Sequence, residues 1–164
     1  MNRFEVETAI WAAVSSLRAG GNIDGELHLV NAIYRYDSAG GFWTTKEEDL
    51  DKFPRITLNT TRREVFENQG SIKHTLVVGV ESIPEWDKRP QAVAISEDII
   101  TLVVRTMLRN NKTIQLPPDN ELVFTFQNID YFSKHRTTTV NAEMTFDVDK
   151  QNICNTLKLP QINE

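Results

Sequence analysis

The side chains that most often carry chemistry are few and widely separated in this chain. His28, His74 and His135 lie far apart, and Cys154 is the single cysteine. A cysteine nucleophile needs a nearby base and an electropositive pocket, and Cys154 falls in a segment with no clear periodicity, so we do not expect it to be catalytic. His74 alternates with apolar residues, which favours a buried structural histidine over a metal ligand.

Carboxylates are grouped at two places, Glu85 with Asp87, and Glu47 with Glu48 and Asp49. Paired carboxylates can act as general acid and base, but in polar loops they are usually solvated charges. The chain contains no Gly-x-x-x-x-Gly-Lys-Ser/Thr, Gly-x-Gly-x-x-Gly, Gly-x-Ser-x-Gly, His-Glu-x-x-His or Cys-x-x-Cys motif. The sequence therefore proposes no reaction, cofactor or metal, and we expect a protein that is not an enzyme.

The elements that would position these residues belong to one domain. A chain of 164 residues fits a single domain with a substantial core. Its 18 basic and 23 acidic residues give a net charge of −5, which argues against a nucleic-acid binder that neutralises phosphates.

One cysteine excludes an internal disulfide. Two glutamates within residues 1–7 disfavour a signal peptide, and no apolar run approaches the roughly 20 residues of a membrane span, so we expect a soluble protein made in a reducing cytoplasm.

Two helices are predicted. Residues 4–18 place one apolar stripe at helical spacing, and Gly20-Gly21 ends that helix because glycine accepts a left-handed cap. The stripe consists of Val6, Ile10, Ala13, Val14 and Leu17. The second helix is expected to begin at Ser96 as N-cap and to close at Asn110-Asn111. Its apolar positions extend well beyond one buried stripe.

About five strands are predicted around these helices. Residues 27–36 alternate like a strand, although a short helix is also compatible with them. Residues 53–59 form a strand that Pro54 should begin or place at an edge. Residues 72–82 carry apolar residues on both faces, which is typical of a central strand. Residues 122–127 and 138–148 alternate regularly and predict a hairpin with its tip at 131–136.

This order predicts an α+β fold, a single domain with a mainly antiparallel sheet of about five strands and two helices packed on one face. Residues 1–148 form that domain, and residues 149–164 form a C-terminal tail that suits contact with a neighbour. Residues 37–52 are read as one long connection. Connections of that length without secondary structure are uncommon and usually functional.

Large aromatic residues in the connecting segments are the main candidates for a binding surface. Exposed aromatic side chains often mark protein–protein contacts. For Trp86, packing onto the chain's own core is an equally good reading, while the polar surroundings of Phe42 and Trp43 favour an interface. A basic hairpin tip is by default a solvated turn and otherwise a contact for an acidic partner. The candidate interface residues are Phe42, Trp43, Glu47, Glu48, Asp49, Trp86, Tyr131, Phe132, Lys134 and Arg136.

The order of elements resembles the tail terminator, or tail completion, proteins of long-tailed bacteriophages. The resemblance covers most of residues 4–148 and departs at residues 37–52 and after residue 148. It rests on a helix at 6–17, the strand Phe-Pro-Arg-Ile-Thr-Leu at 53–58, the strand Thr-Leu-Val-Val-Gly-Val-Glu-Ser at 75–82, a long helix at 92–109, and a hairpin ending in Val-Asn-Ala-Glu-Met-Thr-Phe at 140–146.

The resemblance implies a structural virion subunit that assembles with itself as a ring, typically a hexamer. Such a ring caps the tail tube protein, stops its polymerisation and offers a joining surface to the head–tail connector, or neck, protein. In a contractile tail it would also contact the sheath. DNA would pass through the channel without specific binding, and an acidic lining would repel its phosphates. The expected location is the virion tail or neck, after assembly in the bacterial cytoplasm.

Two other functions are compatible with the sequence. The first is another neck, connector or tube-end protein of similar fold. The second belongs to a different class, a small enzyme or ligand-binding domain with a cleft near Trp86, which would need a concave pocket with convergent polar groups.

Overall fold

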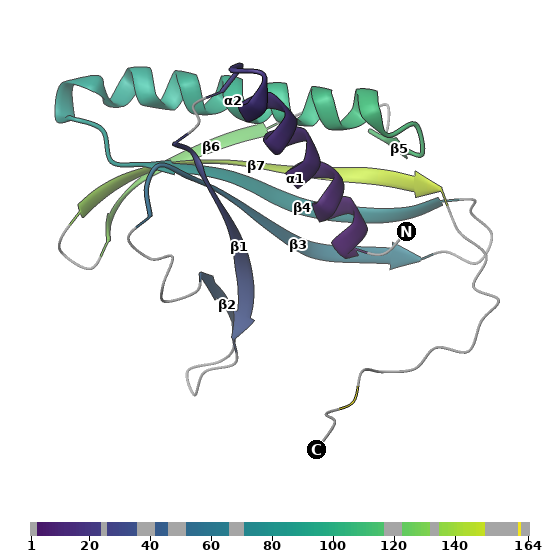
Figure 1. Ribbon diagram of the computed structural model, residues 1–164. Helices are drawn as coiled ribbons and strands as arrows, with labels where there is room; N and C mark the ends of the chain where they lie inside the picture. Colours follow the sequence, from purple (N-terminus) through teal and green to yellow (C-terminus); the bar gives the residue numbers. More distant parts are fainter. Residues whose placement is uncertain are drawn as a thin grey trace.

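Two helices lie on one face of a single β-sheet (Figure 1). The computed structural model describes residues 3–23, 26–35, 42–45, 52–65, 71–116, 123–131, 135–149 and 161. The helices are α1 (Arg3–Ala19) and α2 (Arg89–Asn110), and a short 3₁₀ helix, η2 (Trp86–Lys88), leads into α2. Neither long helix combines the length and hydropathy needed to cross a membrane.

The described sheet has seven strands, and every neighbouring pair is antiparallel except β1 with β3. Its main path runs β2-β1-β3-β4-β7-β5, and β6 also pairs with β7. The predicted α+β class, with both helices on one face, is confirmed. The strands are β1 (His28–Arg35), β2 (Phe42–Thr45), β3 (Arg55–Val65), β4 (Ser71–Ser82), β5 (Ile114–Gln115), β6 (Val123–Tyr131) and β7 (His135–Asp149).

The end of α1 follows from its two glycines. Gly21 has a φ of 73°, its N–H donates to the Arg18 carbonyl at 3.1 Å, and the Asn22 N–H donates to the Leu17 carbonyl at 2.9 Å. These two bonds form a Schellman motif, which satisfies the last carbonyls of a helix. The predicted apolar stripe is buried along its whole length, so both the helix and its stop are confirmed.

The predicted start of α2 at Ser96 is wrong, because the helix begins at Arg89, with Pro90 in its first turn. Proline suits that position because the N–H it lacks would have no partner there in the helix. Ser96 lies inside the helix, buried, and its hydroxyl donates to the Ala92 carbonyl at 2.7 Å. A serine whose hydroxyl bonds back to the preceding turn is easily mistaken for a cap.

The broad apolar surface of α2 is explained largely by packing inside the domain. The helix contacts β4 and β7 on one side and α1 on another. Ile100, Val103 and Met107 are buried, while Ile99 and Leu102 pack partly buried against the same core. An excess of apolar residues on this helix therefore reflects two neighbours, and does not by itself indicate an external partner.

The strand predictions hold with additions. Residues 28–35 are a strand, β4 is central between β3 and β7, and the last two strands form the predicted hairpin. The reading of residues 37–52 as one connection is wrong in part, because Phe42–Thr45 is a strand paired with β1. Pro54 precedes β3, as expected, and its carbonyl accepts the His28 N–H at 2.8 Å.

Candidate functional site

Trp86 is the most exposed large apolar side chain among those described, with 70% of its surface accessible. It begins η2, the turn that carries the chain from the end of β4 into α2. The interpretation that this ring packs into the domain's own core is therefore wrong. Its exposure is compatible with the interface interpretation, which stays a prediction.

The exposed ring is held by its local structure. The Arg89 guanidinium stacks over the indole with its central carbon 4.2 Å from the ring centre. The turn beneath is closed by the Lys88 N–H, which donates to the Glu85 carbonyl at 3.0 Å. Pro90 restricts the backbone in the first turn of α2. A tryptophan fixed in this way loses little conformational freedom when a partner covers it.

The hairpin tip lies at the same end of the sheet as Trp86. Ser82, the last residue of β4, pairs with Thr138, and β6 and β7 continue past that row until Tyr131 pairs with His135. Tyr131 and Arg136 are therefore strand residues next to the tip. Phe132 and Lys134 lie outside the described residues. The register thus brings the predicted tip and the predicted Trp86 loop to one edge of the molecule.

The other aromatic candidates belong to a separate projection. Phe42 pairs with Arg35, and Trp43 pairs with Tyr34, so both belong to the β1–β2 hairpin and not to a loop. Figure 1 shows this hairpin leaving the plane of the main sheet on the side away from the helices. Their side chains are outside the description, and so are Glu47, Glu48 and Asp49.

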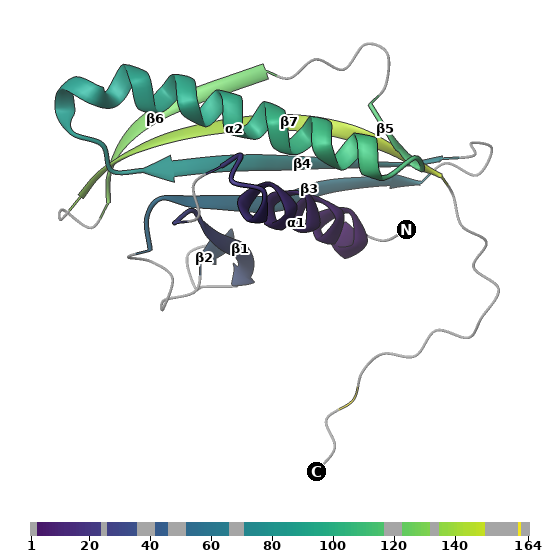
Figure 2. The same ribbon diagram turned by 45° about the horizontal axis from the view of Figure 1, so that its top comes forward.

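Phe126 is an exposed aromatic residue that was not singled out from the sequence. It alternates with Phe124 in a pattern that predicts a common buried face, and it pairs with the buried Val140. Phe124 is half-buried against the core, but Phe126 is 61% exposed. Figure 2 shows the reason: β6 lies on the side of α2 away from α1, so neither helix covers the full width of this strand.

The face of the sheet opposite the helices is polar and ion-paired. Lys73 Nζ lies 3.5 Å from Asp147 Oδ1, and Thr75 and Thr145 share a hydrogen bond of 2.9 Å between their hydroxyls. Near the centre of this face, a Cβ on Gly79 would lie 2.7 Å from Thr57 Oγ1 and would also overlap the Asn141 side chain. Glycine suits this position because the Thr57 and Asn141 side chains occupy the space that a Cβ atom would need.

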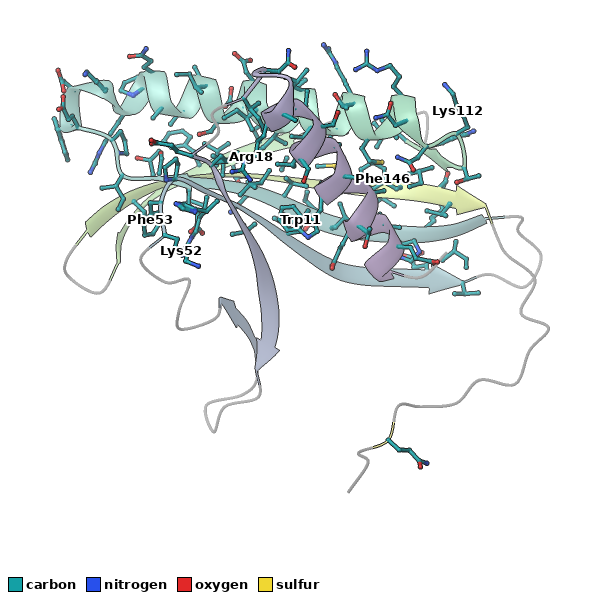
Figure 3. The ribbon with its side chains drawn as sticks, in the orientation of Figure 1. Trp11, Arg18, Lys52, Phe53, Lys112 and Phe146 are labelled. Atoms are coloured by element: carbon teal, nitrogen blue, oxygen red, sulfur yellow. The ribbon has the colours of Figure 1, made fainter. Side chains whose placement is uncertain are left out.

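One ion pair on this face is buried. Arg55 Nε donates to Glu81 Oε2 across β3 and β4, with Arg55 only 2% exposed and Glu81 22% exposed. The Phe53 ring covers the guanidinium, whose central carbon is 4.4 Å from the ring centre. Figure 3 shows Phe53 on the face away from the helices. Arg55, on the opposite face of β3 from Ile56 and Leu58, is thus part of a second, smaller packed layer.

No group of three or more His, Cys, Asp or Glu side chains suited to hold a metal ion occurs within the described part of the chain. His74 is fully buried on the helix-facing side of β4, where it pairs with Phe146. That location agrees with the structural role predicted for it. No model of a known protein family matches this sequence. No curated protein sequence matches it either.

Proposed function

We propose that the chain is a structural subunit that assembles with itself as a ring, a hexamer by resemblance to the bacteriophage tail terminators. The ring would cap the tail tube protein, stop its polymerisation, and present a surface to the neck or head–tail connector protein and, in a contractile tail, to the sheath. DNA would pass through its centre without being bound specifically. The place of action would be the virion tail or neck.

The observation that carries the proposal is the exposed Trp86 held against Arg89. Tryptophan and arginine are the residue types most enriched among those that dominate binding energy at protein interfaces. An indole side chain that is this exposed to water and is fixed in place has no role in the domain's own core. We therefore assign Trp86 to a contact with another subunit or a tail protein.

A closed ring needs two different surfaces on each subunit, because head-to-tail contacts are heterologous. The described elements offer two candidates for these surfaces. One is the edge that carries Trp86 and the β6–β7 tip, and the other is the β1–β2 hairpin with Phe42 and Trp43. The order of helices and strands that carries the resemblance is also consistent with this role.

The test is the assembly state of the purified chain, alone and with a candidate tail tube protein from the same genome, by native mass spectrometry and negative-stain microscopy. Rings are expected for the natural chain. Trp86→Ala should reduce the ring population strongly. Lys112→Ala, at an exposed position just past the opposite end of α2 (Figure 3), serves as the matched control and should not.

Deletion of the gene from the genome that encodes it gives the second readout. Tails of uncontrolled length support a terminator, whereas tails of normal length that fail to join heads support a neck or connector protein. A strict monomer whose deletion leaves tails and heads normal refutes the proposal. A pocket that binds a small molecule at Trp86 would instead favour a ligand-binding domain.

A further inference from the structure

β6 presents a long strand edge without the features that usually protect one. Within the described part of the chain, β6 pairs only with β7. Its nine residues, Val-Phe-Thr-Phe-Gln-Asn-Ile-Asp-Tyr, contain no proline, lysine or arginine and one charged residue, Asp130. The register with β7 runs without a bulge from Val123 to Tyr131. Natural edge strands are normally short, bulged, charged or covered, so we infer that this edge is covered in the assembled protein.

Phe126 marks where the covering segment lies. By register it faces the same side of the sheet as Val140, which is fully buried under the helices. Its own ring is exposed because α2 packs on β4 and β7 and leaves β6 to one side. An added strand on the outer edge of β6 would place side chains directly beside this ring, as cross-strand neighbours do.

We propose that the occupant is the C-terminal segment, residues 150–164, of a second copy of this chain, bound as an added strand on β6. This proposal rests on the self-assembly proposed above, and it names the segment through which one subunit holds the next. In strand addition the backbone hydrogen bonds supply affinity, and alternate side chains supply specificity.

The length and chemistry of this segment fit the edge. Fifteen residues follow Asp149 and can span about 50 Å when extended, whereas nine residues of β6 span about 30 Å. The segment supplies Ile153, Leu157 and Leu159 as apolar side chains to cover Phe126. Its charged side chains, Lys150, Lys158 and Glu164, sum to +1, opposite in sign to the side-chain charge of β6 and of the whole chain.

The geometry favours a neighbouring copy over the same copy. β7 ends at Asp149, beside β5, which pairs with Val148 and Asp147 on the same edge of β7 that β6 uses farther along. To reach the β6 of its own copy, the segment would have to reverse direction and pass outside β5. A subunit placed next to this edge needs no such reversal.

Cys154 allows the contact to be trapped in the full-length chain, because it is the single cysteine and lies within the segment. The test variant is Thr125→Cys, at an exposed position of β6, treated with a short bismaleimide cross-linker. The matched control is Lys112→Cys, at an exposed position beyond α2. We expect covalent dimers and higher multiples joined through positions 125 and 154, about tenfold more than in the control, because binding raises the local concentration of the two thiols. Adding Phe126→Ala should reduce the yield several-fold.

Three results would overturn the inference. The first is a yield in Thr125→Cys no higher than in Lys112→Cys. The second is a cross-link within one copy, seen as a product of monomer mass with both thiols consumed. The third is a cross-link that persists after Cys154→Ser, which would mean that β6 pairs with β6. Rings without the 125–154 linkage would remove this inference alone, whereas linked copies that form no ring would remove the proposed function alone.

Discussion

Replacing Glu81 by glutamine would leave the Arg55 guanidinium charged and shielded from water. Arg55 is 2% exposed and its partner carboxylate is 22% exposed, so the pair is largely desolvated. Removing one member of a buried ion pair costs about 3–5 kcal/mol. The glutamine oxygen can still accept the Arg55 N–H, and part of Glu81 already contacts water, so we place the loss in the free energy of unfolding near 3 kcal/mol, at the lower end of that range.

Urea unfolding followed by tryptophan fluorescence measures this loss, which corresponds to a midpoint shift of about 1–1.5 M for a typical urea dependence. Glu64→Gln is the matched control, because Arg62 and Glu64 form an ion pair on the same face in which Arg62 is 69% exposed and Glu64 is 29% exposed. Exposed pairs contribute about 0–1 kcal/mol. Similar losses in the two variants would refute the argument that burial makes the Arg55 pair costly to break. Pairing Glu81→Gln with Arg55→Met should recover stability, because no buried charge then remains.

Three further substitutions test the core, the polar face and the projecting hairpin. Phe146→Ala should lower the free energy of unfolding by about 3–5 kcal/mol in urea titrations, because this ring is fully buried. Gly79→Ala should cost about 1–3 kcal/mol by thermal unfolding, and Asn141→Ala should restore part of that loss by removing one of the two overlapping side chains. Trp43→Ala should weaken ring assembly in native mass spectrometry more than it lowers the melting temperature; a large drop in the melting temperature of the isolated subunit would show that this residue serves the fold instead.

The elements with strong periodicity were predictable because one face of each is buried. The stripe of α1 and the alternation of β7 both follow directly from contact with a single core. The start of α2 was not predictable in the same way, since Ser96 carries the chemistry of a cap but satisfies its hydroxyl inside the helix. β2 was missed because four residues paired to one neighbour leave no periodic signal.

For the candidate site, the sequence identified the residue types but not their exposure. Trp86 was equally compatible with a core and an interface, and only the position of η2 outside the packed layers separates the two. Phe126 shows the opposite case, because its alternation predicts burial while the lateral position of α2 leaves its ring exposed. Exposure at the edge of a sheet depends on where a helix crosses it, which no local pattern specifies.

The described charged side chains on the outer face of the sheet nearly balance one another. On the sheet face away from the helices, the described charged side chains form three pairs, Arg55–Glu81, Arg62–Glu64 and Lys73–Asp147, with Glu143 in addition. Among the described side chains this face is close to neutral and rich in threonine, so these side chains would contribute little to repulsion of DNA.

The acidic excess is concentrated elsewhere, in residues 37–51, which contain five acidic residues and one lysine and so account for most of the net charge of −5. This segment includes β2, in the hairpin that projects from the sheet. If a ring of these subunits encloses DNA, a sheet face that is close to neutral would let the duplex slide without binding, and an acidic lining would have to come from other parts of the chain, among which residues 37–51 carry the largest acidic excess. The hypothesis of an acidic lining therefore becomes a statement about the sequence segment 37–51 and not about the described face of the sheet.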